Sequence, residues 1–160
     1  MHSLPIAKSS QWQAQEIHLF LTSTTVPMRL ACQDANGFPL VCSLWFCYHD
    51  NYLWCVSHEK SHIVKLLKAD NKVAFEVGVN APPYLGIRGQ GQVTLLREPA
   101  AAMLSMMLDR YQVDADSKLA KWLLGRISKE YAVRIDIKRI SAWDYTQRMS
   151  PTAEQVSLQP

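Results

Sequence analysis

The sequence contains no run of about 18 apolar residues, the length that a membrane-spanning helix needs. Its first residues, MHSLPIAKSSQWQAQ, also lack the apolar core of a secretory signal. The net charge is only +3, and the basic residues form no long run of the kind that nucleic-acid binders carry. These absences predict a cytoplasmic protein that has neither a membrane nor a nucleic acid among its partners.

Several chemical signatures are also missing. The four cysteines form no C-x-x-C pair, so we expect reduced thiols that pack as small apolar side chains: Cys32, Cys42, Cys47 and Cys55. Neither Ser43 nor Ser105 lies in the G-x-S-x-G frame of a nucleophile elbow. The string RGQGQV lacks the spacing and the following helix of a dinucleotide fingerprint. No catalytic constellation is therefore evident.

The hydrophobic pattern predicts mainly strands. A length of 160 residues is that of one domain, which we expect over residues 1–149, with a loose polar tail at 150–160. Alternating or continuous apolar runs predict strands at 28–34, 38–48, 52–57, 72–79, 84–96 and 131–145. Helical spacing predicts helices from Ser9 or Ser10 to about residue 21, at 61–70, from 97 to 108, and at 117–128.

These elements favour an antiparallel β-barrel with helical additions. The strand at 38–48 is apolar on both sides, which predicts a barrel wall with something packed outside it. In the last strand Val133, Ile135 and Ile137 are expected to face inward, alternating with charged residues. Glycines within 84–96 indicate strong curvature.

The string HEKSH at 58–62 matches the H-E-x-x-H motif of zinc proteases. That motif requires both histidines inside one continuous helix, whereas the strand at 52–57 runs up to His58 and helical spacing begins only near Ser61. No third ligand follows at a suitable distance. The sequence therefore argues against zinc hydrolysis and predicts no metal site.

The same segment is rich in groups that bind anions. Ser57, Lys60, Ser61, His62 and Lys65 surround the start of a short helix, where free backbone N–H groups and the helix dipole favour a phosphate. The alternative, which the residues leave open, is that a serine simply caps the helix while the lysines face water.

Five tryptophans are many for this length, and Trp45, Trp54 and Trp143 fall on predicted strands. Such residues either fill the core or line an aromatic ligand pocket. The methionines at 103, 106 and 107 share one helix and are expected in the core or an interface.

An ordered series of short motifs resembles one known family, the FMN-binding split barrels of the pyridoxamine 5'-phosphate oxidase-like superfamily. The series comprises Arg29-Leu30-Ala31, Gly37-x-Pro39, Trp45-Phe46, Ser57 to Lys65, Asp70-x-x-Val73, Ile87-x-Gly89-x-Gly91-x-Val93 and the closing ISAWDY at 140–145. The match covers roughly residues 12–147.

The resemblance implies a homodimer with two FMN sites at its interface, a deazaflavin or FAD being the alternative cofactor. It implies that Cys42, Ser43, Leu44 and Trp45 run along the flavin ring, and that Ser57 supplies a hydroxyl near the flavin. Ser61 and His62 match the phosphate loop, and the basic residue that usually follows falls on Ile63, so that Lys60 or Lys65 would substitute. Tyr84 and Trp143 are expected to reach the site from the partner chain.

The resemblance further implies an FMN-dependent oxidoreductase acting on an unidentified small molecule. The flavin itself carries the redox chemistry, which agrees with the lack of a catalytic constellation. A non-catalytic module that binds or stores a flavin, deazaflavin or haem is the second hypothesis. The tail lacks the Arg-x-His element of the vitamin B6 oxidases, which argues against pyridoxamine phosphate as the substrate.

Overall fold

The computed structural model describes residues 3–150 and contains one curled, fully antiparallel sheet of seven strands. The strand order is β2-β1-β5-β6-β7-β4-β3. The strands are β1 (Met28–Gln33), β2 (Pro39–Leu44), β3 (Cys47–His49), β4 (Tyr52–His58), β5 (Lys72–Gly78), β6 (Leu85–Leu96) and β7 (Glu130–Asp144). The helices are α1 (Ala14–Ser23), α2 (His62–Ala69), α3 (Ala100–Arg110), α4 (Lys118–Gly125), α5 (Thr146–Met149) and the short 3-10 helix η1 (Ile127–Lys129). This arrangement confirms the predicted class, mainly β with helical additions.

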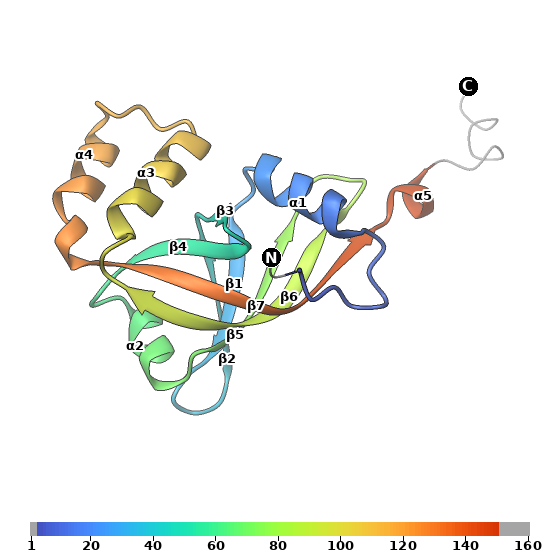
Figure 1. Ribbon diagram of the computed structural model, residues 1–160, viewed down its shortest axis with the longest axis horizontal. Helices are drawn as coiled ribbons and strands as arrows, with labels where there is room; N and C mark the ends of the chain where they lie inside the picture. Colours follow the sequence, from blue (N-terminus) through green and yellow to red (C-terminus); the bar gives the residue numbers. More distant parts are fainter. Residues whose placement is uncertain (1–2, 151–160) are drawn as a thin grey trace, which may run out of the picture.

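The two longest strands, β6 and β7, run across the whole molecule and join its two ends (Figure 1). Val133, Ile135 and Ile137 of β7 are buried as the alternation predicts, because they face the inside of the curled sheet. The register between β6 and β7 shifts at Gln90/Gly91, which is the irregularity that the glycines of this strand indicated.

Helix α2 closes one end of the curled sheet (Figure 1). Its apolar side chains all lie in the main core: Ile63, Val64, Leu66 and Leu67. The helix also contacts β1 and β4, so the turn that precedes it is fixed to the barrel on both sides.

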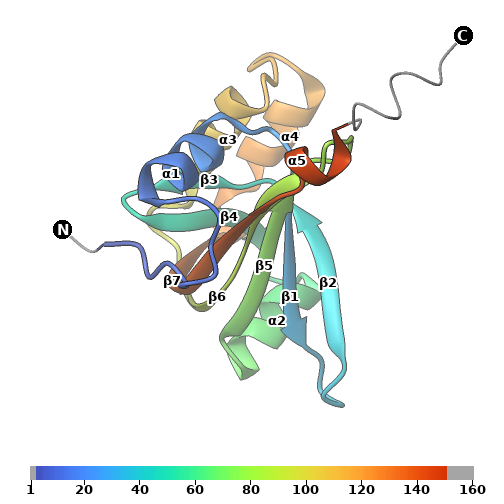
Figure 2. The ribbon, with the colours of Figure 1, turned by 90° about the vertical axis from the view of Figure 1, so that its right-hand side faces the viewer.

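The segment 38–48 differs from its prediction as one strand buried on both sides. It forms β2 and β3, separated by Trp45 and Phe46, and every second residue of β2 is exposed. The reason is the sheet order, since β2 lies at an edge and pairs only with β1. Figure 2 shows β5, β1 and β2 side by side, with the outer face of this part of the sheet uncovered.

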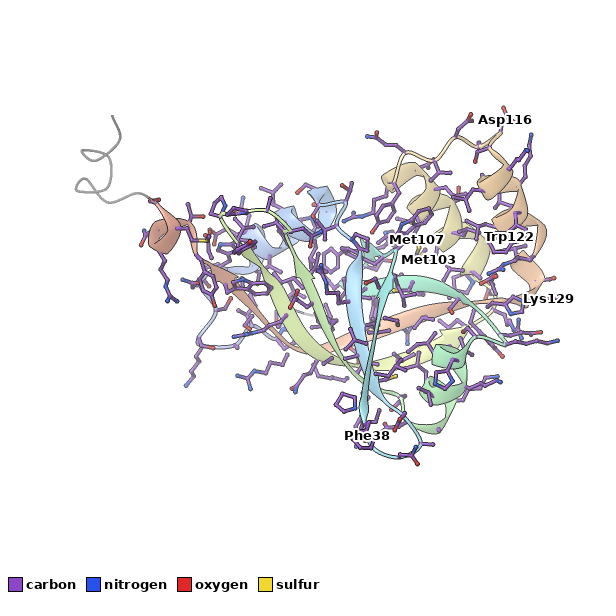
Figure 3. The ribbon with its side chains drawn as sticks, turned by 180° about the vertical axis from the view of Figure 1, so that it is seen from behind. Phe38, Met103, Met107, Asp116, Trp122 and Lys129 are labelled. Carbon is purple, nitrogen blue, oxygen red and sulfur yellow. The ribbon has the colours of Figure 1, made fainter. Side chains whose placement is uncertain are left out.

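Helix α3 packs against β3, β4 and β7 at the opposite end of the sheet from α5. Met103 and Met107 are buried between this helix and the sheet (Figure 3). Met106 is partly buried against the same cluster, so the expected packing of the three methionines is confirmed. Helix α4 packs on α3, and it ends at Gly125, earlier than predicted, because the chain tightens into η1.

The first helix also differs from its prediction. It begins at Ala14, and Gln13 and Glu16 form a capping box across its first turn. The Ser10 hydroxyl instead donates to the carbonyl of Trp12 and accepts from the N–H of Ala142, so it ties the N-terminal segment to β7.

None of the helices between residues 3 and 150 is long and apolar enough to cross a membrane. The predicted loose tail falls almost entirely on residues 151–160, which lie outside the described residues.

Candidate functional site

The turn between β4 and α2 brings two predicted site residues into contact. The hydroxyl oxygens of Ser57, on β4, and Ser61 lie 2.9 Å apart, and both side chains are half-buried. Ser61 is the N-cap of α2, because its hydroxyl accepts a hydrogen bond from the N–H of Val64 at 3.3 Å. Its own N–H donates to the carbonyl of His58, which fixes the turn. Capping and ligand binding are therefore compatible at this serine, since a hydroxyl has more than one hydrogen-bonding site.

Donors without a partner surround this hydroxyl pair. Within residues 3–150, the N–H groups of His62 and Ile63 have no hydrogen-bond acceptor, as expected in the first turn of a helix. The side chains of Lys60, His62 and Lys65 are exposed beside them. Hydroxyls, free amides and ammonium groups around a helix N-terminus are the donor set that a phosphate requires. The phosphate group of FMN therefore fits the residues that are present.

Ile63, where the resemblance leads us to expect a basic residue, points into the core and not toward this turn. The side chain of Ile63 is only 7% exposed and lies in the main core, below the helix. The exposed lysines near Ser61 are Lys60 and Lys65, the two residues that the sequence offered as substitutes.

The structure does not have the geometry that the zinc-protease motif requires. His58 ends β4 and His62 begins α2, so the two histidines do not share a helix. Glu59 forms an ion pair with Arg97, with the nitrogen and oxygen 2.6 Å apart. The hydrogen bond from Arg97 lowers the pKa of the Glu59 carboxyl. Among residues 3–150, no group of three potential metal ligands comes together.

Arg97, which follows β6, contacts this turn, and the sequence did not reveal that contact. Besides Glu59, its guanidinium donates to the carbonyl of Ser128 at 3.0 Å and lies 3.9 Å from the ring centre of Tyr131. Tyr131 in turn pairs with Ser57 across β4 and β7. Arg97 thus ties the end of β6 to both walls of the turn. Its separation of 38 residues from Glu59 leaves no local pattern that could have predicted the contact.

Strand β2 presents three further predicted residues along an edge of the sheet. Cys42, Ser43 and Leu44 pair with Leu30, Arg29 and Met28 of β1, and the other side of β2 has no neighbouring strand. Backbone N–H and C=O groups at a free edge can pair with the polar rim of a planar ligand. The edge therefore suits the predicted role of this backbone.

Trp45 directly follows β2, and its ring packs against other side chains of the chain. The indole stacks on Tyr111 with ring centres 4.9 Å apart and an interplanar angle of 12°. It packs against the clusters formed by α3 and α4. The ring of Trp45 is thus held by Tyr111 and is only partly exposed.

Tyr84 and Trp143 lie at the other end of β7. Trp143 lies twelve residues along β7 from Tyr131, the partner of Ser57, so the two residues stand near opposite ends of this long strand. Tyr84 lies next to this end, because its carbonyl accepts from the N–H of Tyr145. Within one chain the structure does not bring these two residues to the Ser57–Ser61 turn.

The thiols have no features of a nucleophile. Burial raises the pKa of Cys47 to about 11 and also raises the pKa of Cys32, Cys42 and Cys55. All four are free cysteines, as predicted, although Cys42 is only half-buried.

The comparison with known proteins gives one family. Residues 14–144 match the family model described as pyridoxamine 5'-phosphate oxidase. A search of curated protein sequences gives no significant match.

Solved structures share the fold at low sequence identity. A conserved hypothetical protein from Mycobacterium tuberculosis has a TM-score of 0.76 and 20% identity, over 91% of this chain and 93% of that one. An F420 reductase has a TM-score of 0.64 and 21% identity, over 76% of this chain and 93% of its own. HutZ, the haem storage protein from Vibrio cholerae, has a TM-score of 0.62 and 13% identity, over 81% and 92%. These similarities confirm the predicted split barrel, and the family match covers most of the chain. The chain belongs to the pyridoxamine 5'-phosphate oxidase family.

Proposed function

We propose that this protein binds FMN at the interface of a homodimer and acts as an oxidoreductase on a small molecule. The observation that carries the proposal is the pair of hydroxyls at the start of α2, Ser57 and Ser61, beside two free N–H groups and two lysines. In a chain of this family, that donor set is suited to the phosphate of the cofactor.

The ring of the flavin would lie along the free edge of β2. There the backbone of residues 42–45 offers donors and acceptors to the polar rim of the ring, while the side chain of Trp45 stays in the helical packing. The bound flavin would supply hydride or electron transfer. The protein's part is to hold the phosphate, orient the ring and exclude water.

A second copy of the chain completes this site. Tyr84 and Trp143 lie at the opposite end of β7 from Ser57, and in this proposal they reach the cofactor from the partner chain. The exposed Val41 on β2 and Phe38 at the tip of the β1–β2 turn provide apolar surface for that contact.

A cytoplasmic location and the absence of nucleic-acid partners remain predictions.

A non-catalytic binder is the second candidate. It is favoured by the fold shared with a protein named for haem storage, and an F420 reductase among the neighbours makes a deazaflavin the alternative cofactor.

The absorption spectrum of the purified protein, before and after incubation with FMN, tests the proposal. A flavin spectrum that is bleached by a reduced nicotinamide supports the oxidoreductase. A flavin spectrum that no reductant changes on a catalytic timescale supports the binder. A colourless protein that takes up no added FMN contradicts both.

A further inference from the structure

The outer face of the sheet carries a hollow that the proposed flavin site does not use. Cross-strand pairing places Arg29, Glu76, Arg88 and Ser141 in one row and Ala31, Ala74, Gln90 and Arg139 in the next. Because Ala31 and Ala74 are small, three adjoining hollows of about 750, 330 and 220 Å³ open over this face, and all three share Ala74.

The hollow of about 330 Å³ is lined by two positive charges. Arg88 and Arg139 both line it, together with Ser141 and Gln90. Within residues 3–150, neither arginine has a carboxylate partner. The nearest acidic residue in the row, Glu76, is already paired with Arg29 at 3.5 Å. Two guanidinium groups without counter-charges favour an anion with two oxygens, such as a carboxylate or phosphate.

An aromatic platform adjoins the arginines. The indole of Trp143 lies over Gly78 and Gly86, where an added Cβ would come within 3.0 and 2.8 Å of the ring. The guanidinium of Arg88 lies 5.9 Å from the centre of the same ring. A partly exposed tryptophan whose ring lies on two glycines offers a flat surface on which a planar ligand can stack.

We propose that a small planar molecule with an acidic group binds here, its anionic oxygens in the hollow on Arg88 and Arg139 and its ring beside the hollow on Trp143. That this ligand is the substrate of the flavin rests on the proposed function, in which Trp143 reaches the cofactor of the partner chain. The binding of the anion itself needs no flavin.

Benzoate and benzamide are the probes, because they share a ring and differ in one charge. Calorimetric titration of the full chain without flavin should show that benzoate binds and that benzamide binds at least tenfold more weakly. Arg88→Gln and Arg139→Gln, on different strands, should each weaken benzoate binding roughly 10- to 100-fold, the value of a charge-assisted hydrogen bond. Lys121→Gln on α4 removes the same charge outside the hollow and should leave the affinity unchanged.

Two results would overturn the inference. Equal affinity for benzoate and benzamide, or benzoate binding that both arginine variants leave intact, would show that the arginines hold no anion. An absence of benzoate binding in a dimer that Arg88→Gln converts to monomer would make this face a contact between copies instead. Titration of the same samples with FMN separates the two claims, since the proposed FMN binding fails if FMN is not taken up, whatever the result with benzoate.

Discussion

The two ends of β7 differ in how much of a binding site one chain supplies. At the first end, beside Tyr131, the turn before α2 is held by its own contacts: Ser57 to Ser61, Glu59 to Arg97, and the N–H of Glu59 to the carbonyl of Lys129. At the second end, Trp143 has a half-exposed ring, and Arg88 and Arg139 have no carboxylate partner among the described residues. The first end is therefore held in place by contacts within one chain, and our proposals put an anion there and a ligand or a second chain over the second end.

The largest effect is expected from removing the donors of the first end. The double variant Ser61→Ala/Lys65→Ala should weaken FMN binding by about 2–4 kcal/mol, since it removes a hydroxyl and a charge from the phosphate. Fluorescence titration measures this loss. Ser105→Ala/Lys121→Ala removes the same two residue types from exposed positions on α3 and α4, and it should bind FMN as the wild type does. Equal losses in both variants would place the phosphate elsewhere.

The second end depends on glycine beneath the indole. A Cβ at Gly86 would lie 2.4 Å from the carbonyl oxygen of Val77 and 2.6 Å from Cα of Gly78, both backbone atoms that cannot give way. Gly86→Ala should therefore lower the free energy of unfolding by about 3 kcal/mol, as measured by denaturant titration. Gly125→Ala is the matched control, because no atom lies within 4 Å of its added Cβ, and a change below about 1 kcal/mol is expected. A stable Gly86→Ala variant with an unchanged Trp143 environment would refute the close packing.

Arg97 tests how the first end is preorganised. Arg97→Gln should weaken FMN binding by about 1 kcal/mol, because the turn loses its link to Glu59 and to the carbonyl of Ser128. Arg148→Gln, which removes an arginine stacked on exposed Tyr145, serves as the control for a lost charge. If Arg97→Gln lowers the melting temperature but leaves the FMN affinity intact, the arginine supports the fold and not the site.

The smallest effect concerns pH. The hydrogen bond from Arg97 lowers the pKa of Glu59 below its unfolded value of 4.5. The stability that this pair contributes is therefore present above about pH 4.5 and is lost as the pH falls through the lower folded value. Thermal unfolding should show a slightly steeper acid loss for the wild type than for Glu59→Gln. Parallel acid profiles would mean that the pair contributes nothing.

The comparison of the two ends also shows what a sequence can predict. The inward side of β7 and the start of α2 at Ser61 follow from short-range periodicity and capping, and the structure confirms both. The exposure of β2 could not be predicted, because an apolar run looks the same in an edge strand and in a central one. The departure of Trp45 from the strand likewise depends on Tyr111, which follows much later in the chain.

The binding features show the same division. The cluster from Ser57 to Lys65 is contiguous, so its donors could be predicted from the sequence alone. Arg97 with Glu59, and Trp143 with Gly78 and Gly86, come together only through the order of the strands. Sequence therefore predicts a site formed by one turn, and the structure is needed for a site formed across a sheet.

The most direct test of the phosphate site compares FMN with riboflavin, which has the same ring and no phosphate. Fluorescence titration of the wild-type protein should give a dissociation constant at least about 30-fold lower for FMN, the ratio that corresponds to about 2 kcal/mol. The Ser61→Ala/Lys65→Ala variant should remove most of that difference. Equal affinities of the wild-type protein for FMN and riboflavin would contradict a phosphate site at the start of α2.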